Sequence, residues 1–408
     1  MRTFYNSFCI RMLVLGLFTA FGLQAALPER SLVVEVHDRA ATEVFRPRQE
    51  PLGPMMRRGI SELLGSADAA EGLGKLVGAD DIVGIKVYAL KDGAGGVRPE
   101  VVRALIELLG EAGVPAEHIV IWDRSWEALY GAGFVKLAQE CGVRVEATAE
   151  AGFDKEVFYS SFFPSSLVYG DVEFAKERQG LSQKEEKSVE PAIRIEPGLS
   201  ADEEQPGRRS FVSRLLSQEV TRIILVTPLL HHNSLGATGH IYSLASGSTD
   251  NFLRFEADGY RLAEAATEIY AMEAVGDKVV LCITDALFCQ YRGQSASFLH
   301  YTQELNELWF SRDPVALDAR AFRKMMDIRR DRAMEAGVPM DVAWAGRTLL
   351  ENALLLELGN ASEGRINVRR FELGQESSSP APKTNVSPKE VLPAVEKARS
   401  PWWKFWKR

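Results

Sequence analysis

The segment between Asp81 and Asp123 constrains the fold most, because it has the pattern of a strand, a crossover helix and a second strand. The β-branched run DIVGIKVYAL (81–90) is typical of a strand covered on both faces. A glycine-rich loop follows, and Pro99 opens a stretch with apolar residues at helical spacing. The run HIVIWD (118–123) predicts the second strand. Such a connection makes the two strands parallel and the crossover right-handed.

Strand and helix patterns alternate along the rest of the chain. This alternation predicts an α/β fold, with a mainly parallel sheet and helices on both faces. Residues 175–214 interrupt it with charge runs and few apolar side chains, so we expect a solvated acidic insertion there. The remaining strands are expected at 31–38, 222–228, 278–287, 305–311 and 365–371, and the helices at about 257–274, from 313, and at 341–359.

The first 26 residues resemble an export signal. Two arginines and no acid accompany the apolar run 12–23, and Ala25 and Ala26 provide small residues before a cleavage point. The run is too short to cross a bilayer comfortably as a helix. We therefore expect residues 1–26 to be a signal peptide that directs the protein to the periplasm or envelope, with an uncleaved anchor as the alternative.

The last 34 residues, 375–408, are rich in Ser, Pro and Lys and are expected to be a disordered tail. Tryptophan favours the headgroup layer of a membrane and lysine favours anionic lipid. The end of the tail is therefore predicted to contact a membrane surface, the alternative being that its aromatic rings dock on the protein itself or on a partner. The contacting side chains would be Trp402, Trp403, Trp406, Lys404 and Lys407.

Charge is unevenly distributed along the chain. The whole chain has a net charge of −8. Residues 1–26 contribute +2 and residues 375–408 contribute +4, so the α/β domain, 27–374, has a net charge of −14. Proteins that bind nucleic acid normally rely on clustered Lys and Arg. The body of the protein is therefore not expected to bind nucleic acid.

Three cysteines remain after the signal, namely Cys141, Cys282 and Cys289. An odd number cannot form a closed disulfide framework. Cys282 and Cys289 could pair in an oxidising compartment, but burial as small core residues is the favoured interpretation. The sequence has no CxxC pair and no cysteine run of the iron–sulfur type, so no iron–sulfur cluster is expected.

Polar residues recur where the predicted strands end. In an open parallel sheet ligands collect beyond the carboxyl ends of the strands, which favours Lys86, Asp123 and Asp285 as the catalytic groups. Lys86 would neutralise charge on a small anionic ligand, and the two aspartates would act as acid–base groups or ligands. Lys86 lies in an otherwise apolar strand and needs an acidic partner such as Asp123 or Asp285.

The densest cluster of polar residues is TPLLHHNSLGATGH (227–240). Imidazoles close to Asp285 could hold a divalent metal, with His231, His232 and Asp285 as its ligands, although HH followed by H at this spacing matches no standard metal signature. The alternative is that these histidines are exposed or form hydrogen bonds. The candidate ligand-binding residues are Arg124, Ser125, His231, His232, Thr238 and Gly239.

Five segments follow one another along the chain: VGIKVYAL, RPEVVRALIELLGEAGVPAEHIVIWDRS, RIILVTPLLHHNSLGATG, VVLCITDAL and SRDPVALDARAF. In these segments and their order the chain resembles the domain of unknown function 362 family. The resemblance spans roughly 82–322 without the insertion, and it implies an α/β fold but no assigned activity. Some relatives carry a ferredoxin-like cysteine segment, which this chain lacks.

The chain departs from the family in the histidine-containing segment. The family typically has Pro-Lys-Leu-Lys-x-His and then GxTGxxKN. Pro228, Gly236, Thr238 and Gly239 match, whereas Leu229, His231 and Asn233 stand at the Lys, Lys and His positions, and Tyr242 and Ser243 replace the Lys-Asn pair. Lys86, Asp123, Asp285, Asp313 and Asp318 keep their family positions; Asp313 is also well placed as a helix N-cap.

Two classes of function are consistent with these features. The first is an exported protein that binds a small anionic ligand or a divalent metal at the carboxyl edge of its sheet, derived from an enzyme with an altered site. The second is a non-catalytic, membrane-associated envelope scaffold that uses the same fold.

Overall fold

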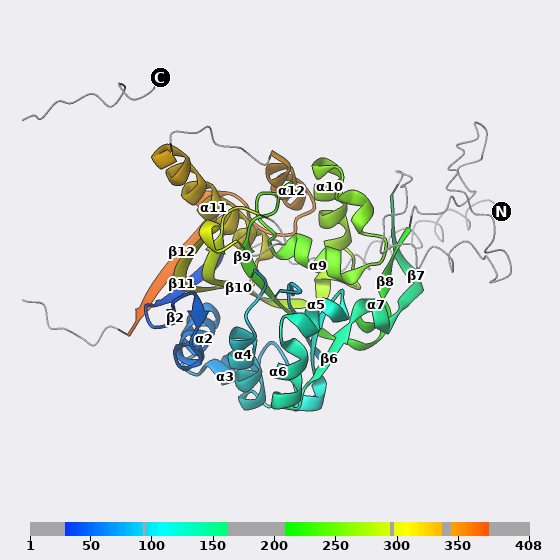
Figure 1. The fold of residues 1–408 in the computed structure, drawn as a ribbon. Helices are drawn as coiled ribbons and strands as arrows, with labels where there is room; N and C mark the ends of the chain where they lie inside the picture. The colour runs from blue at the N-terminus through cyan, green and yellow to red at the C-terminus, as the bar shows by residue number, and fades with distance from the viewer. Residues whose placement is uncertain (1–28, 93–94, 162–208, 294–297, 337–343, 375–408) are drawn as a thin grey trace, which may run out of the picture. The chain divides into compact units, whose positions relative to one another are not determined.

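A computed structural model describes residues 29–92, 95–161, 209–293, 298–336 and 344–374 (Figure 1). The expected signal peptide, most of the expected insertion and the expected membrane-contacting tail lie outside these residues. None of the described helices combines the length and hydropathy needed to cross a membrane.

The fold is built on an eight-stranded sheet in the order β12-β1-β11-β10-β9-β4-β5-β6. β11 is antiparallel to both of its neighbours, and every other adjacent pair is parallel. The mainly parallel sheet predicted from the sequence is confirmed. Its strands are β1 (Ser31–Asp38), β4 (Val83–Lys86), β5 (Ile119–Asp123), β6 (Arg144–Ala147), β9 (Arg222–Leu230), β10 (Val279–Gln290), β11 (Thr302–Ser311) and β12 (Ile366–Leu373).

Helices cover both faces of the sheet, as the alternating pattern predicts (Figure 1). Each face has its own hydrophobic cluster, so the sheet separates two cores. One face packs against α2 (Gln49–Leu64), α3 (Ala69–Leu73), α4 (Pro99–Glu111) and α6 (Phe134–Cys141); the other packs against α9 (His240–Ser248), α10 (Gly259–Tyr270), α11 (Pro314–Ala336) and α12 (Trp344–Leu355). The short helices α5 (Trp126–Gly131) and α7 (Thr148–Ala151) follow β5 and β6.

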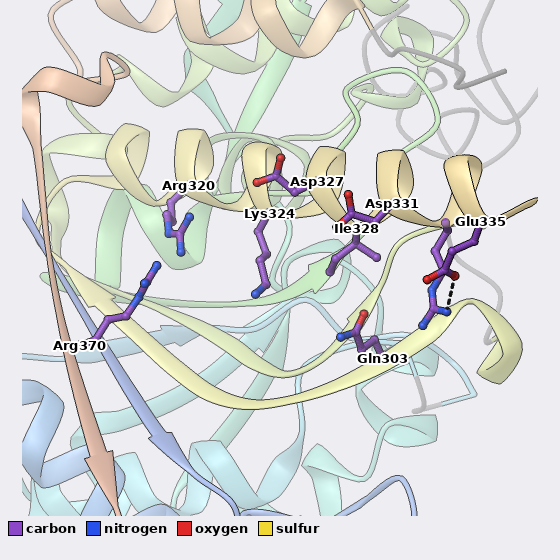
Figure 2. A pocket seen from close by; sticks show the side chains of 9 residues that line it. Gln303, Arg320, Lys324, Asp327, Ile328, Asp331, Glu335 and Arg370 are labelled. Atoms are coloured by element: carbon purple, nitrogen blue, oxygen red, sulfur yellow. Dashed lines mark hydrogen bonds and ion pairs between the residues drawn. The ribbon is translucent and has the colours of Figure 1, made fainter. Parts of the chain in front are cut away.

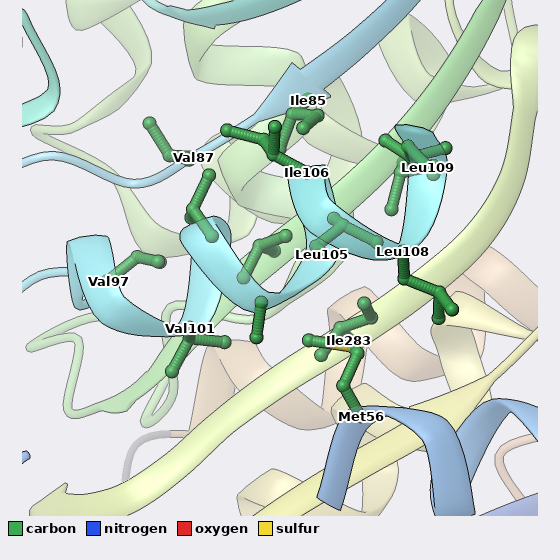
Figure 3. Packing of buried hydrophobic residues seen from close by; sticks show 14 of the residues in the cluster. Met56, Ile85, Val87, Val97, Val101, Leu105, Ile106, Leu108, Leu109 and Ile283 are labelled. Atoms are coloured by element: carbon green, nitrogen blue, oxygen red, sulfur yellow. The ribbon is translucent and has the colours of Figure 1, made fainter. Parts of the chain in front are cut away.

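The predicted strand–helix–strand unit is present as β4, α4 and β5. Pro99 occupies the first turn of α4, and Leu105 and Leu109 are fully buried against the sheet. Figure 3 shows α4 lying over Ile85 of β4 and Ile283 of β10. The strand is shorter than the run 81–90 suggests, because the chain leaves the sheet after Lys86 to form the loop that leads to α4.

The C-terminal end of the expected insertion is a strand, which corrects the expectation for 209–213. β8 (Arg209–Ser213) pairs antiparallel with β7 (Phe153–Ser160). Val212 is fully buried, and Phe211 N–H donates to the Asp250 carboxylate at 2.7 Å. The buried side chain of Val212 and the hydrogen bond from Phe211 to Asp250 therefore fix a segment whose composition predicted exposure to solvent. The short strands β2 (Thr42–Glu43) and β3 (Arg46–Pro47) form a separate hairpin after β1.

The three described cysteines are free thiols. Cys282 and Cys289 are fully buried on β10, in the core between the sheet and α11. Burial raises the pKa of both thiols. The interpretation as small core residues is confirmed, and the alternative pairing of Cys282 with Cys289 is not formed.

Candidate functional site

Lys86 and Asp123 lie side by side at the carboxyl ends of β4 and β5. The Lys86 ammonium is 2.8 Å from Asp123 Oδ1 and donates to Val87 O at 2.7 Å and to Ser243 Oγ at 3.3 Å. These three acceptors match the three N–H donors of an ammonium group. Of the two acidic partners considered for Lys86, Asp123 and Asp285, the structure places Asp123 beside it. The pair is enclosed, because Lys86 is 0% exposed.

Burial lowers the pKa of Lys86, and the Asp123 carboxylate opposes this shift. Asp123 is itself held by backbone donors, from Ala89 N at 2.7 Å and Arg124 N at 2.8 Å. Gly247 of α9 packs directly over the lysine, since a Cβ there would lie 2.3 Å from Lys86 Cε. The pair therefore fastens the loop after β4 to the end of β5, under the cover of α9.

His232 belongs to a hydrogen-bonded network next to this pair. Its Nδ1 accepts from Ser234 N and Leu235 N, so the proton resides on Nε2, which lies 3.4 Å from Glu256 Oε2. Tyr242 donates to Glu256 Oε1 at 2.7 Å and its ring lies 4.6 Å from the His232 ring. Burial raises the pKa of Tyr242 well above its usual value. His232 therefore serves this internal network.

The predicted metal ligands are not brought together. His231 Nε2 lies 3.1 Å from the Arg329 guanidinium, and His232 belongs to the network with Glu256. A guanidinium at this distance competes with a cation for the imidazole nitrogen. Within the described ranges no group of three His, Cys, Asp or Glu side chains is arranged to hold a metal ion. The prediction that His231, His232 and Asp285 together hold a metal ion is therefore wrong for the arrangement that the structure describes.

Asp285 lies on the opposite face of the sheet from Lys86. Its carboxylate accepts from Arg98 N at 2.9 Å and lies 3.7 Å from Arg98 Nη1, at the start of α4. Lys86, in contrast, contacts α9 on the other face. Side chains alternate along a strand, so neighbours such as Thr284 and Asp285 face opposite ways. Lys86 and Asp123 therefore meet as predicted, whereas Asp285 does not join them.

Burial shifts the pKa of both Asp285 and Arg98. It raises the pKa of the Asp285 carboxyl and lowers that of the Arg98 guanidinium, and their mutual attraction offsets part of each shift. The Asp285–Arg98 pair anchors the glycine-rich loop to β10 on the α4 side of the sheet. Lys86 and Asp123 anchor the same loop to β5.

The other candidate binding residues have local structural contacts. Ser125 caps α5 by accepting from Ala128 N at 3.4 Å, and Arg124 O accepts from Ala149 N. Thr238 N–H donates to Leu230 O at 2.8 Å. These contacts shape the loops that follow β5 and β9.

Gly239 and Asp318 together begin α9. Gly239 has φ +65°, and a Cβ there would lie 2.8 Å from the Asp318 carboxyl. Asp318 accepts from the N–H groups of His240 at 2.6 Å and Ile241 at 3.0 Å, and from His240 Nδ1 at 2.9 Å. Asp313 caps α11 by accepting from Ala316 N at 2.9 Å, which confirms its predicted capping role.

A pocket of about 300 Å³ opens at the carboxyl edge of the sheet, on the α4 side. Loops and element ends distant in sequence form it: the β2–β3 hairpin, the start of α4, the end of β10 and the start of β11. We call it the edge pocket, and its principal lining residues are Phe45, Arg98, Glu100, Phe288, Gln290 and Phe298.

The edge pocket combines an aromatic wall with one buried cation. Phe45 stacks on Phe288, with ring centroids 6.2 Å apart, and the Arg98 guanidinium lies 4.6 Å from the Phe288 centroid. Gln290 Oε1 accepts from Phe298 N at 3.2 Å, which holds the second aromatic side of the pocket. None of these residues was a candidate in the sequence. The one sequence feature that could have indicated this pocket is the position of Arg98, between a glycine-rich loop and the proline that starts a helix.

The turn that carries Phe45 is strained. Val44 and Phe45 have φ of 50° and 57°, which is the left-handed region that two-residue hairpin turns normally fill with Asn or Gly. The turn is anchored, because Phe45 N–H donates to Glu304 Oε1 at 2.8 Å. Such strain is characteristic of segments that hold a functional side chain in place. Here it sets the Phe45 ring over Phe288.

No family model matches the chain, and no curated protein is found similar to it. A crystal structure of a protein from Thermotoga maritima, a target of the Northeast Structural Genomics Consortium, is similar over 70% of this chain, with a TM-score of 0.33 and 15% identity. This chain spans 60% of the length of that protein. A likeness this weak does not establish a shared function.

Proposed function

We propose that the protein binds a small organic anion with an aromatic or apolar group in the edge pocket. The observation that carries the proposal is the placement of Arg98 against Phe288 in a concave site of about 300 Å³. Sites for small molecules are largely apolar and contain a few fixed polar groups. A planar guanidinium suits a carboxylate or a phosphate oxygen.

Both buried ion pairs support the proposal by fixing the position of Arg98. Asp285 binds the Arg98 backbone and lies beside its guanidinium, while Arg98 Nη1 donates to Gly96 O at 2.6 Å. Asp123 holds Ala89 in the same loop, at 2.7 Å. A cation that is already ordered loses little conformational entropy when a ligand binds. Lys86 and Asp123 therefore act in this proposal as positioning residues.

The test uses benzoate and its uncharged analogue benzamide with the full-length protein, in isothermal titration calorimetry. Benzoate is expected to bind more tightly than benzamide because of Arg98. Phe298→Ala removes one aromatic side of the pocket and should weaken benzoate binding about tenfold. The matched control is Tyr260→Ala, an exposed aromatic residue of α10 on the other face of the sheet. Equal affinity for the two probes, or equal effects of the two substitutions, would contradict the proposal.

We further propose that the chain is a divergent, exported member of the domain of unknown function 362 family. This rests on the motifs around Lys86, Asp123 and Asp313 and on the apolar run 12–23. Mass spectrometry of the mature protein from a secreting host should find an amino terminus near residue 27. An intact terminus at Met1 would contradict export with cleavage.

The envelope-scaffold alternative depends on the tail. Trp402, Trp403 and Trp406 would insert into the headgroup layer beside the basic residues. Co-sedimentation with vesicles of anionic lipid should be reduced when the three tryptophans are changed to Ala. Unchanged sedimentation would exclude this contact.

A further inference from the structure

A second pocket of about 480 Å³ lies between α11 and the strands β11 and β12 (Figure 2). It has no lining residue in common with the edge pocket, and it lies on the other face of the sheet. We call it the α11 pocket. The lining residues that matter here are Gln303, Arg320, Lys324, Asp327, Asp331 and Arg370.

Three basic side chains meet at one end of the α11 pocket. In Figure 2, Arg320 and Lys324 extend from α11 towards the strands, and Arg370 extends from β12 towards them. The anionic neighbour of the two arginines is Glu35, which is 3% exposed and accepts from Arg320 Nε at 2.5 Å and from Arg370 Nε at 2.6 Å. One buried carboxylate is thus shared between two guanidinium groups.

Lys324 adds a charge that this arrangement does not neutralise. Among the described residues its ammonium has neither a hydrogen bond nor an ion pair. Glu307 is a further carboxylate near Arg370 and accepts from Trp309 Nε1 at 2.7 Å. Counting both carboxylates against the three cations leaves this end of the pocket with one net positive charge, in a body that is otherwise strongly acidic.

The acidic residues of α11 that line the pocket, Asp327, Asp331 and Glu335, are paired within the helix, and Asp327 and Asp331 share one arginine. Asp327 lies 3.0 Å from Arg330 Nη1, and Asp331 lies 3.3 Å from Arg330 Nε. Glu335 lies 3.1 Å from Arg332 Nη1, and this pair is drawn in Figure 2. These carboxylates are therefore not the partners of Arg320, Lys324 and Arg370.

We propose that the α11 pocket is a binding site for a phosphate group, either inorganic phosphate or a phosphate monoester. Arg320 donates to Glu35 from Nε at 2.5 Å and from Nη2 at 3.5 Å, and Arg370 donates to it from Nε at 2.6 Å. Nη1 of Arg320 and both terminal nitrogens of Arg370 therefore remain for a second oxyanion. Lys324 supplies a point charge, and Gln303 can donate from its amide. A doubly charged tetrahedral oxyanion matches this set of donors, because it offers oxygens in several directions to three converging cations.

The test measures binding of inorganic phosphate and of glycerol 3-phosphate to the full-length protein at constant ionic strength, by titration calorimetry and by the rise in Tm. Lys324→Gln removes a side chain with no partner and should leave the fold intact while weakening phosphate binding about tenfold or more. Lys324→Arg should retain binding. The matched control is Lys136→Gln, an exposed lysine of α6 whose side chain is 81% exposed.

Tighter binding of glycerol 3-phosphate would identify an organic phosphate as the ligand, and equal binding would identify inorganic phosphate. The proposal is overturned by the absence of saturable binding up to about 10 mM of either probe. It is also overturned if Lys324→Gln binds as well as the wild-type protein, or if Lys136→Gln loses as much affinity as Lys324→Gln. Phe298→Ala, in the edge pocket, should leave phosphate binding unchanged.

Discussion

The Lys86 ammonium lies 2.8 Å from the Asp123 carboxylate, and the pair joins the ends of two adjacent parallel strands inside the protein. Each charge is compensated locally, Lys86 by three acceptors and Asp123 by backbone donors on both sides. Removal of one partner from such a buried pair leaves the other charge uncompensated, which is far more costly than replacement of the pair.

Lys86→Met is therefore expected to reduce the free energy of unfolding by about 3–5 kcal/mol. The double variant Lys86→Met/Asp123→Asn should lose less than Lys86→Met alone, because the uncompensated carboxylate is gone. Urea denaturation monitored by circular dichroism gives both values. A loss below about 1 kcal/mol for Lys86→Met would show that the pair is not enclosed as described.

Gly247 is expected to tolerate no side chain. Gly247→Ala would place a Cβ 2.3 Å from Lys86 Cε, so we expect a lower Tm and a destabilisation of about 1–3 kcal/mol. The matched control is Gly110→Ala in α4, where no atom lies within 4 Å of the new Cβ. That change should stabilise the protein by up to about 1 kcal/mol, since alanine is the better helix former. Equal effects of the two substitutions would contradict the packing of α9 over Lys86.

The strained hairpin turn predicts a stabilising substitution. Val44 has φ 50° and is 82% exposed, so it makes little packing contribution to offset its backbone strain. Val44→Gly should raise the free energy of unfolding by about 1 kcal/mol. Val44→Ala shortens the side chain without relieving the strain and should change stability little. If both variants behave alike in urea denaturation, the left-handed conformation is not the cause.

Asp285 predicts a particular pH dependence. Because burial raises its pKa above the usual 3.8, the stabilising effect of the protonated form is complete below that value and is lost as the pH rises through the folded-state pKa. The free energy of unfolding of the wild-type protein should therefore fall relative to that of Asp285→Asn as the pH rises above the usual carboxyl pKa of 3.8. Denaturation at several pH values measures the difference. A difference of the opposite sign would mean that attraction to Arg98 outweighs burial.

Glu100 predicts a gain of affinity in the edge pocket. Glu100 lines the same cavity as Arg98, and its negative charge would repel an anionic ligand. Glu100→Gln should strengthen benzoate binding a few-fold, equivalent to at most about 1 kcal/mol. Benzamide serves as the control, because an uncharged ligand should bind both forms equally. Weaker benzoate binding in Glu100→Gln would indicate that Glu100 orders the pocket.

The sequence by itself determined the elements whose signals are local. The spacing of Leu105 and Leu109 after Pro99 specifies α4 and the face that it buries, and the neighbouring β-branched runs specify β4 and β5. The need of a buried lysine for an acid likewise pointed to Asp123 or Asp285, and Asp123 is the partner found. These inferences succeed because helix and strand periodicity, proline geometry and the desolvation of charge act within a few residues or across one strand pairing.

Tertiary structure decided which groups meet. Asp285 and Lys86 both lie in the carboxyl-terminal half of a predicted parallel strand, yet β10 directs Asp285 to α4 while β4 directs Lys86 to α9. A shift of one residue in a strand exchanges the two faces of a sheet, and the sequence of one strand does not state its register against another. The edge pocket depends on the same kind of information, because Phe45, Arg98 and Phe298 lie far apart in the chain. Only long-range strand pairing and helix packing bring them together.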